Sequence, residues 1–92
     1  MNLLEEARID INDVDREMAK LFEKRMQAAE KVIAYKIENN LPIFDSSREA
    51  DVIEKNCKLI ENEKYITYYK EFIQHLMDLS KNYQKSILDQ NK

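Results

Sequence analysis

The sequence contains no glycine and no tryptophan, and it has one proline, one cysteine and one histidine in 92 residues. A β-sandwich needs turn residues at short intervals, so the lack of glycine argues against that fold. The single cysteine, Cys57, has no partner for an internal disulfide, which suits a reducing compartment and indicates a small buried residue. Ser-His-Asp, Cys-His, HExxH and CxxC sets and glycine-rich phosphate loops are all missing. We therefore expect no metal and no cofactor.

Long apolar runs are missing as well. No stretch approaches the roughly 18 apolar residues that a membrane span needs. The first ten residues, MNLLEEARID, are acidic and lack the apolar region of a secretion signal. The net charge of -3 and the pI of about 5.2 argue against a general nucleic-acid partner. We expect a cytoplasmic protein that binds neither membranes nor nucleic acids.

The apolar periodicity and the helix-end signals predict an all-α fold of three helices in one domain, residues 1–92. The first helix is expected from about residue 2 to residue 39, since Asn39 and Asn40 tolerate the left-handed conformation that ends a helix and Pro42 follows. The second is expected to start among residues 45–47 and to end near residue 60. The spacing of Ser46 and Glu49 is that of a capping box. The third is expected over about residues 64–89.

The first helix has a heptad-like apolar row. The steps alternate three and four along Leu4, Ala7, Ile11, Val14, Met18, Leu21, position 25, Ala28, Val32 and Tyr35. A helix of 36 residues is about 54 Å long, whereas a compact chain of this size is only about 32 Å across. The other two helices cannot cover the whole row. We therefore predict an intertwined helical homodimer, because a two-fold dimer is the commonest way to bury such a surface.

Polar side chains interrupt the apolar faces. Arg25 stands in the row itself, Arg8 and Lys36 lie beside it, and Ser80 and Gln84 fall on the apolar face of the third helix. Arg25 and Lys36 are about 16 Å apart along the backbone, close enough for long side chains to bracket a small ligand. Arg8 is about 25 Å from Arg25 and reaches that ligand only across an antiparallel dimer. Arginine forks bind carboxylates, and Lys and Gln donate to a developing negative charge.

Each of these side chains also has a purely structural explanation. The alternatives are an ion pair of Arg25 with Glu23 or Glu30, a C-terminal cation at Lys36, a capping role for Glu49, a hydrogen bond from Ser80 to the Leu76 carbonyl, and a surface position for Gln84. His75 is favoured as a solvated or packed residue rather than a catalytic one. Taken together, the cations and hydrogen-bond donors favour a binding site for a small anionic ligand over these separate structural explanations.

The combined motifs resemble the all-helical class of chorismate mutases, type II, over essentially the full length. The matching segments are LLEEARIDINDVDREMAKLFEKR, the V-x3-K of Val32 and Lys36, PIFDSSRE, and the S-x3-Q of Ser80 and Gln84. The sequence departs from the family pattern at two places. The turn before the third helix lacks the glycine often found there, and Lys81 adds a charge next to Ser80.

The resemblance implies a role for each matching residue. Lys36 and Gln84 would donate to the substrate's ether oxygen from opposite sides, and Lys36 would also bond a carboxylate. Arg25 would bind one carboxylate, and these three residues would be catalytic. Arg8 would cross into the partner's active site and bind the other carboxylate. The remaining substrate-binding positions would be Asp45, Arg48 and Glu49 at the start of the second helix, with Glu49 and the Asp45 backbone near the ring hydroxyl, and Ser80 at a carboxylate. Val32 and Met77 would supply apolar walls, and Asp15 a structural role, orienting an arginine.

The implied reaction is the rearrangement of chorismate to prephenate in phenylalanine and tyrosine biosynthesis. It is one pericyclic step that needs no nucleophile, metal or proton relay. Two other functions stay open. An isochorismate-pyruvate lyase shares this fold and pocket, although the Arg48-Glu49 pair favours the mutase. A non-catalytic helical dimerisation or regulatory module would explain the long apolar row but not the polar set.

Overall fold

Three α-helices and one short 3₁₀ helix make up the fold in the computed structural model, which describes residues 1–91. Helix α1 spans Leu3–Glu38, α2 spans Ser46–Cys57 and α3 spans Ile66–Gln90, with the 3₁₀ helix η1 at Glu63–Tyr65. The described residues contain no strand. The predicted all-α fold of three helices is confirmed.

Asparagines set both ends of α1. The Asn2 side chain accepts a hydrogen bond from the backbone N–H of Glu5 and caps the N-terminus. At the other end Asn40 has φ of 53°, the left-handed conformation expected there. This turn lets the N–H of Leu41 bond the Lys36 carbonyl at 2.8 Å, which closes the helix and turns the chain toward α2.

Asp45 begins α2. Its side chain accepts a hydrogen bond from the backbone N–H of Arg48 at 3.0 Å, so Asp45 is the N-cap. The capping box between Ser46 and Glu49 is therefore wrong, because Glu49 is left to bond α3 instead. Helix α2 also ends at Cys57, three residues before the predicted end, where i to i+3 turns replace the helix. Cys57 is half-buried rather than fully buried.

The core lies along α3, which packs against both α1 and α2. Val52 of α2 contacts Ile73 and Met77 of α3, and Ala29 and Ile33 are the buried residues of α1. Within the described part of the chain, α1 and α2 make no close backbone contact with each other. Helix α3 is therefore the central helix, and α1 and α2 are joined through their packing on it.

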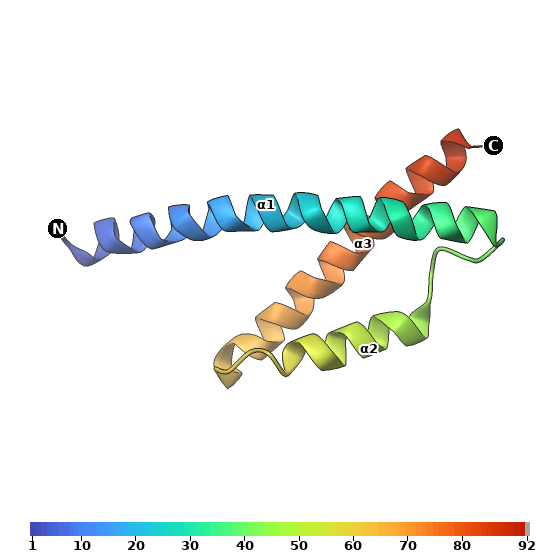
Figure 1. Ribbon diagram of the computed structural model, residues 1–92. Helices are drawn as coiled ribbons and strands as arrows, with labels where there is room; N and C mark the ends of the chain where they lie inside the picture. The colour runs from blue at the N-terminus through green and yellow to red at the C-terminus, as the bar shows by residue number, and fades with distance from the viewer. Residues whose placement is uncertain (92) are drawn as a thin grey trace.

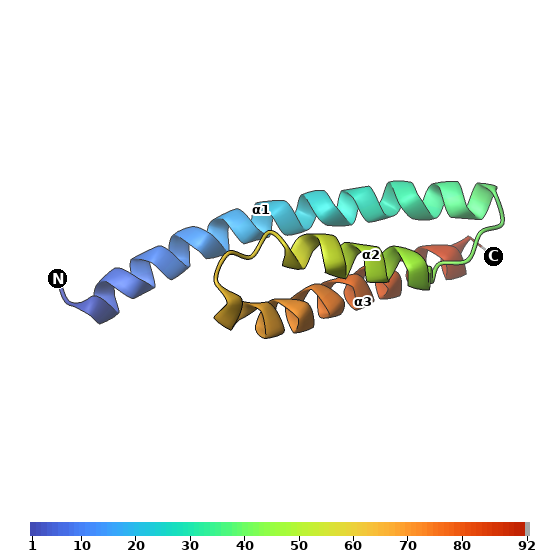
Figure 2. The same ribbon diagram turned by 90° about the horizontal axis from the view of Figure 1, so that it is seen from below.

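Helix α1 is too long for its neighbours. In both views its N-terminal part projects beyond α2 and α3 (Figures 1 and 2). The radius of gyration is 16.6 Å, against about 12 Å for a compact chain of this length. The apolar row of α1 is exposed, with Leu4 at 57% and Leu21 at 61%. None of the described helices has the length and apolar character to cross a membrane.

Candidate active site

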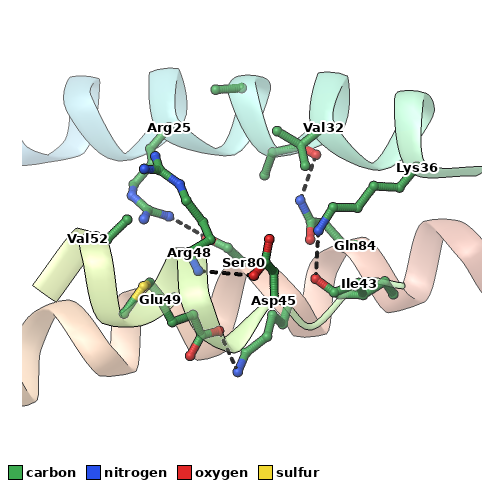
Figure 3. A pocket seen from close by; sticks show the side chains of 14 residues that line it. Arg25, Val32, Lys36, Ile43, Asp45, Arg48, Glu49, Val52, Ser80 and Gln84 are labelled. Carbon is green, nitrogen blue, oxygen red and sulfur yellow. Dashed lines mark hydrogen bonds and ion pairs between the residues drawn. The ribbon is translucent and has the colours of Figure 1, made fainter. Parts of the chain in front are cut away.

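A cavity of about 300 Å³ lies between α1 and α2, above α3. Small-molecule sites in proteins begin at about this size. Its lining brings together residues far apart in the sequence, and Figure 3 shows them converging from all three helices and the linker before α2. The lining consists of Arg25, Ala28, Ala29, Val32, Lys36, Ile43, Asp45, Arg48, Glu49, Val52, Met77, Ser80, Lys81 and Gln84.

The charge of this lining is opposite to that of the whole chain. Four cationic and two acidic side chains line the cavity, a net charge of +2, in a chain whose net charge is -3. The Arg25 and Arg48 side chains lie toward one end of the cavity, and Lys36 and Gln84 lie toward the other (Figure 3). Guanidinium groups bind carboxylates, so this arrangement suits a small anion with more than one polar group.

Ser80 orients Arg25. The Ser80 hydroxyl donates to the Leu76 carbonyl at 3.0 Å and accepts a hydrogen bond from Arg25 Nη1 at 2.6 Å. The expected bond from Ser80 to Leu76 is thus present, and it aims the hydroxyl lone pairs at the arginine. The alternative pairing of Arg25 with Glu30 is wrong: among the described residues Arg25 bonds Ser80, and Glu30 accepts from the Tyr83 hydroxyl at 2.6 Å.

Within residues 1–91, Lys36 and Gln84 are each anchored by one hydrogen bond. Lys36 Nζ donates to the Ile43 carbonyl at 2.8 Å, and Gln84 Nε2 donates to the Ala29 carbonyl at 3.0 Å. An ammonium carries three donor hydrogens and an amide carries two. Both groups therefore keep hydrogens for a ligand while their positions are held. The surface position considered for Gln84 is wrong, since its side chain is buried at 6% exposure.

A polar cluster joins α2 to α3 at the cavity's edge. Lys81 Nζ lies 2.8 Å from Glu49 Oε2 and 3.3 Å from Asp78 Oδ1. Gln74 donates to Glu49 Oε1 at 3.3 Å and to Asp78 Oδ1 at 3.1 Å. The hydrogen bond with Glu49 is the main cause that raises the pKa of Lys81 above its ordinary value. The hydrogen bond from Gln74 lowers the pKa of Asp78, and Lys81 adds to this effect.

Seven of the eight predicted substrate-binding residues line this one cavity: Arg25, Lys36, Asp45, Arg48, Glu49, Ser80 and Gln84. Val32 and Met77, the predicted apolar walls, line it too. Arg8 does not line it, and stands on α1 well before Arg25, the first lining residue in the sequence. Its predicted place in the site requires a second subunit.

A second hollow lies between α1 and α3. It measures about 680 Å³, and apolar side chains dominate its lining, including Met18, Leu21 and Phe22 of α1 with Phe72, Leu76 and Leu79 of α3. Asp15 and the exposed His75 stand at this hollow. Arg25 lines both this hollow and the cavity, so the two are adjacent along α1.

Sequence reasoning missed the Ile43 carbonyl at the cavity and the partner that Gln74 and Lys81 share at its edge. The Ile43 carbonyl belongs to the linker backbone, and no side-chain pattern indicates where a backbone oxygen points. Gln74 and Lys81 are seven residues apart, two helical turns, which places them on one face of α3. That spacing offered a signal, but it does not reveal Glu49 as the shared partner.

The residues 7–85 match the family model described as chorismate mutase type II. This segment covers most of the chain and includes every predicted site residue from Arg8 to Gln84. The chain belongs to the chorismate mutase type II family. The predicted resemblance is confirmed, and the enzymes of this family belong to the predicted class, the isomerases.

One similar curated protein is the bifunctional chorismate mutase/prephenate dehydratase of Aquifex aeolicus (strain VF5). It is 29% identical over 89 residues, which cover 88% of this chain and 25% of that protein. The chain therefore spans about a quarter of the length of this relative. No solved structure gives a significant match.

Proposed function

We propose that the chain rearranges chorismate to prephenate, a step of phenylalanine and tyrosine biosynthesis, in the cavity between α1 and α2. The observation that carries this proposal is the cavity itself: a net positive lining, in an acidic chain of this family, that gathers seven of the predicted residues. Chorismate carries two carboxylates, a ring hydroxyl and an ether oxygen. Arginines, a carboxylate and neutral or cationic donors are the groups that bind these.

The rearrangement is intramolecular, so catalysis consists of positioning and electrostatics. Arg25, oriented by Ser80, binds one carboxylate, and Arg48 helps to hold the substrate at the same end of the cavity. Clamping the diaxial conformer brings the two reacting carbons together. As the C–O bond breaks, negative charge grows on the ether oxygen. Lys36 and Gln84 donate their remaining hydrogens to it, and these bonds strengthen in the transition state.

The second carboxylate is bound by Arg8 of the partner subunit in an intertwined homodimer. The exposed apolar row of α1 and the apolar hollow beside it support this part of the proposal. An apolar helix face of this length is unfavourable in water, and a second copy of the same helix buries it. The site is complete only in the dimer.

A turnover assay with the purified chain tests the proposal. We expect chorismate to be consumed and prephenate to appear, with no pyruvate released from isochorismate. Pyruvate release from isochorismate, without chorismate consumption, would instead identify the lyase. If neither substrate is consumed and chorismate fails to raise the melting temperature, the chain is a non-catalytic module and the proposal is wrong.

A further inference from the structure

Lys81 has a charged partner that faces the cavity. Its Nζ is 2.8 Å from Glu49 Oε2, and both side chains line the cavity. The Glu49 and Lys81 side chains are 16% and 28% exposed, so this pair is partly shielded from water. In the ion pair of Lys58 with Glu54, at the end of α2, both side chains are more than 70% exposed. Shielding strengthens an ion pair, because less solvent screens it.

The other contacts of Lys81 are with Asp78 and Phe44, which do not line the cavity. Asp78 Oδ1 lies 3.3 Å from Nζ, and the Phe44 ring centroid lies 4.7 Å from it. An ammonium donates three hydrogen bonds, and two carboxylates and a ring face account for its surroundings here. Asp78 does not line the cavity. Lys81 is thus held against the wall of the cavity rather than extended into it.

Glu49 poses an electrostatic problem in the proposed site. A carboxylate at the cavity would repel a substrate with two carboxylates, yet it is the acceptor that a ring hydroxyl needs. Both of its oxygens are held by α3, Oε2 by Lys81 and Oε1 by Gln74 at 3.3 Å. This arrangement fixes the side chain in one orientation and places a positive charge 2.8 Å from the negative one.

We propose that Lys81 is a positioning residue that holds the Glu49 carboxylate at the cavity and compensates its charge, so that a dianionic substrate binds beside it. This inference rests on the proposed function. Lys81 touches Glu49, not the substrate. Its contribution belongs to substrate binding rather than to the chemical step, because no reacting atom lies near it in the proposed arrangement. A cation at position 81 thereby makes Glu49 compatible with an anionic ligand.

Steady-state kinetics with chorismate on the dimeric full chain test this role. Lys81→Met keeps the length of the side chain and removes its charge; we expect KM to rise about ten-fold with kcat within about two-fold of the wild type. Lys81→Arg restores the ion pair and should bring KM back to near the wild-type value. Lys85→Met, one turn along α3 at an exposed position outside the cavity lining, removes the same charge and should leave both constants unchanged. Lys81→Gln, which keeps a donor without the charge, is measured alongside, so that the result does not depend on one variant folding.

A double-mutant cycle separates positioning from direct contact. In a Glu49→Gln background, Lys81→Met should change KM less than two-fold, because the charge that Lys81 compensates is gone. A full ten-fold rise in that background would mean that Lys81 binds the substrate itself, and the inference would be wrong. If kcat and the melting temperature fall without the selective rise in KM, Lys81 has only a structural role, and the inference is wrong. Wild-type inactivity refutes the proposed function, whereas an active wild type with unaffected Lys81 variants refutes only this inference.

Discussion

At the scale of single residues, the cavity holds its donors before any ligand binds. Lys36, Gln84 and Arg25 each contact a fixed oxygen, at Ile43, Ala29 and Ser80. Donors placed in advance need little reorganisation when charge develops, and this is the main source of electrostatic catalysis. The predictions at this scale therefore concern the hydrogen-bond donors, and turnover rates test them.

Lys36→Ala is expected to lower kcat by about 100-fold to 1,000-fold, the usual cost of removing one donor to a developing negative charge. The dimer should remain folded, as judged by circular dichroism and molecular mass. Lys31→Ala is the control, since Lys31 is exposed on the same helix and lies outside the cavity lining. Near-normal turnover of Lys36→Ala would contradict the assigned mechanism.

Gln84 predicts a flat pH dependence. A neutral amide donates a hydrogen bond at any pH, so kcat should persist through neutral and mildly alkaline pH. In Gln84→Glu, kcat should fall as pH rises, because a carboxyl group donates a hydrogen bond only while it is protonated. Position 84 is buried, and burial favours the protonated carboxyl over the charged one. A pH–rate profile of both proteins checks this. A sharp loss of wild-type activity between about pH 6 and 8 would exclude the role of Gln84.

At the scale of elements, capping places α2 and hence its cavity residues. The Asp45 side chain bonds the N–H of Arg48, and Arg48 and Glu49 follow within the first turn. Asp45→Ala should lower the free energy of unfolding by about 1 kcal/mol, the usual value for an N-cap. Ser46→Ala, one residue along and without a capping bond, should change it by less than about 0.5 kcal/mol. Chemical denaturation measures both; equal effects would show that Asp45 is not the cap.

A hydrogen bond between Tyr83 and Glu30 ties α3 to α1. This bond, to which burial adds, raises the pKa of Tyr83 above its ordinary value of 10.0. A raised pKa means that the protonated phenol is favoured in the folded state. Its contribution is therefore complete below pH 10.0 and is lost as the pH rises through the raised pKa. The difference in unfolding free energy between wild type and Tyr83→Phe should be constant near neutral pH and shrink above about pH 10; a constant difference at all pH values would contradict this tie.

At the scale of the whole molecule, the projecting half of α1 governs assembly. The two isoleucines Ile11 and Ile9 are 56% and 49% exposed in the single chain, but only Ile11 belongs to the apolar row. We expect a particle of about twice the 11.0 kDa chain mass for the wild type and for Ile9→Lys. Ile11→Lys should dissociate it and lose turnover, since Arg8 of the partner subunit would then be absent. Light scattering after gel filtration measures the mass, and a dimeric, active Ile11→Lys would refute the proposed interface.

The sequence alone determined the helices and most of the cavity's residues. Helix formation follows from local signals: the apolar period, the asparagines at the ends of α1, and the lack of glycine. The polar residues Ser80 and Gln84 stood out because they occupy an apolar face, and both are buried. The family motifs added Asp45, Arg48 and Glu49 to the predicted site, because the apolar periodicity does not single them out.

Only the tertiary structure decided which partners these side chains take. Ser80 rather than Glu30 accepts from Arg25, Asp45 rather than Ser46 caps α2, and Glu49 pairs with Lys81 across two helices. The row of α1 that packs on α3 contains Ala29 and Ile33, one position round from the predicted row, whose Ala28 and Val32 line the cavity. Local sequence sets where a helix begins and which face is apolar. The separation of α1 and α2 above α3 depends on long-range packing, and that separation creates the cavity.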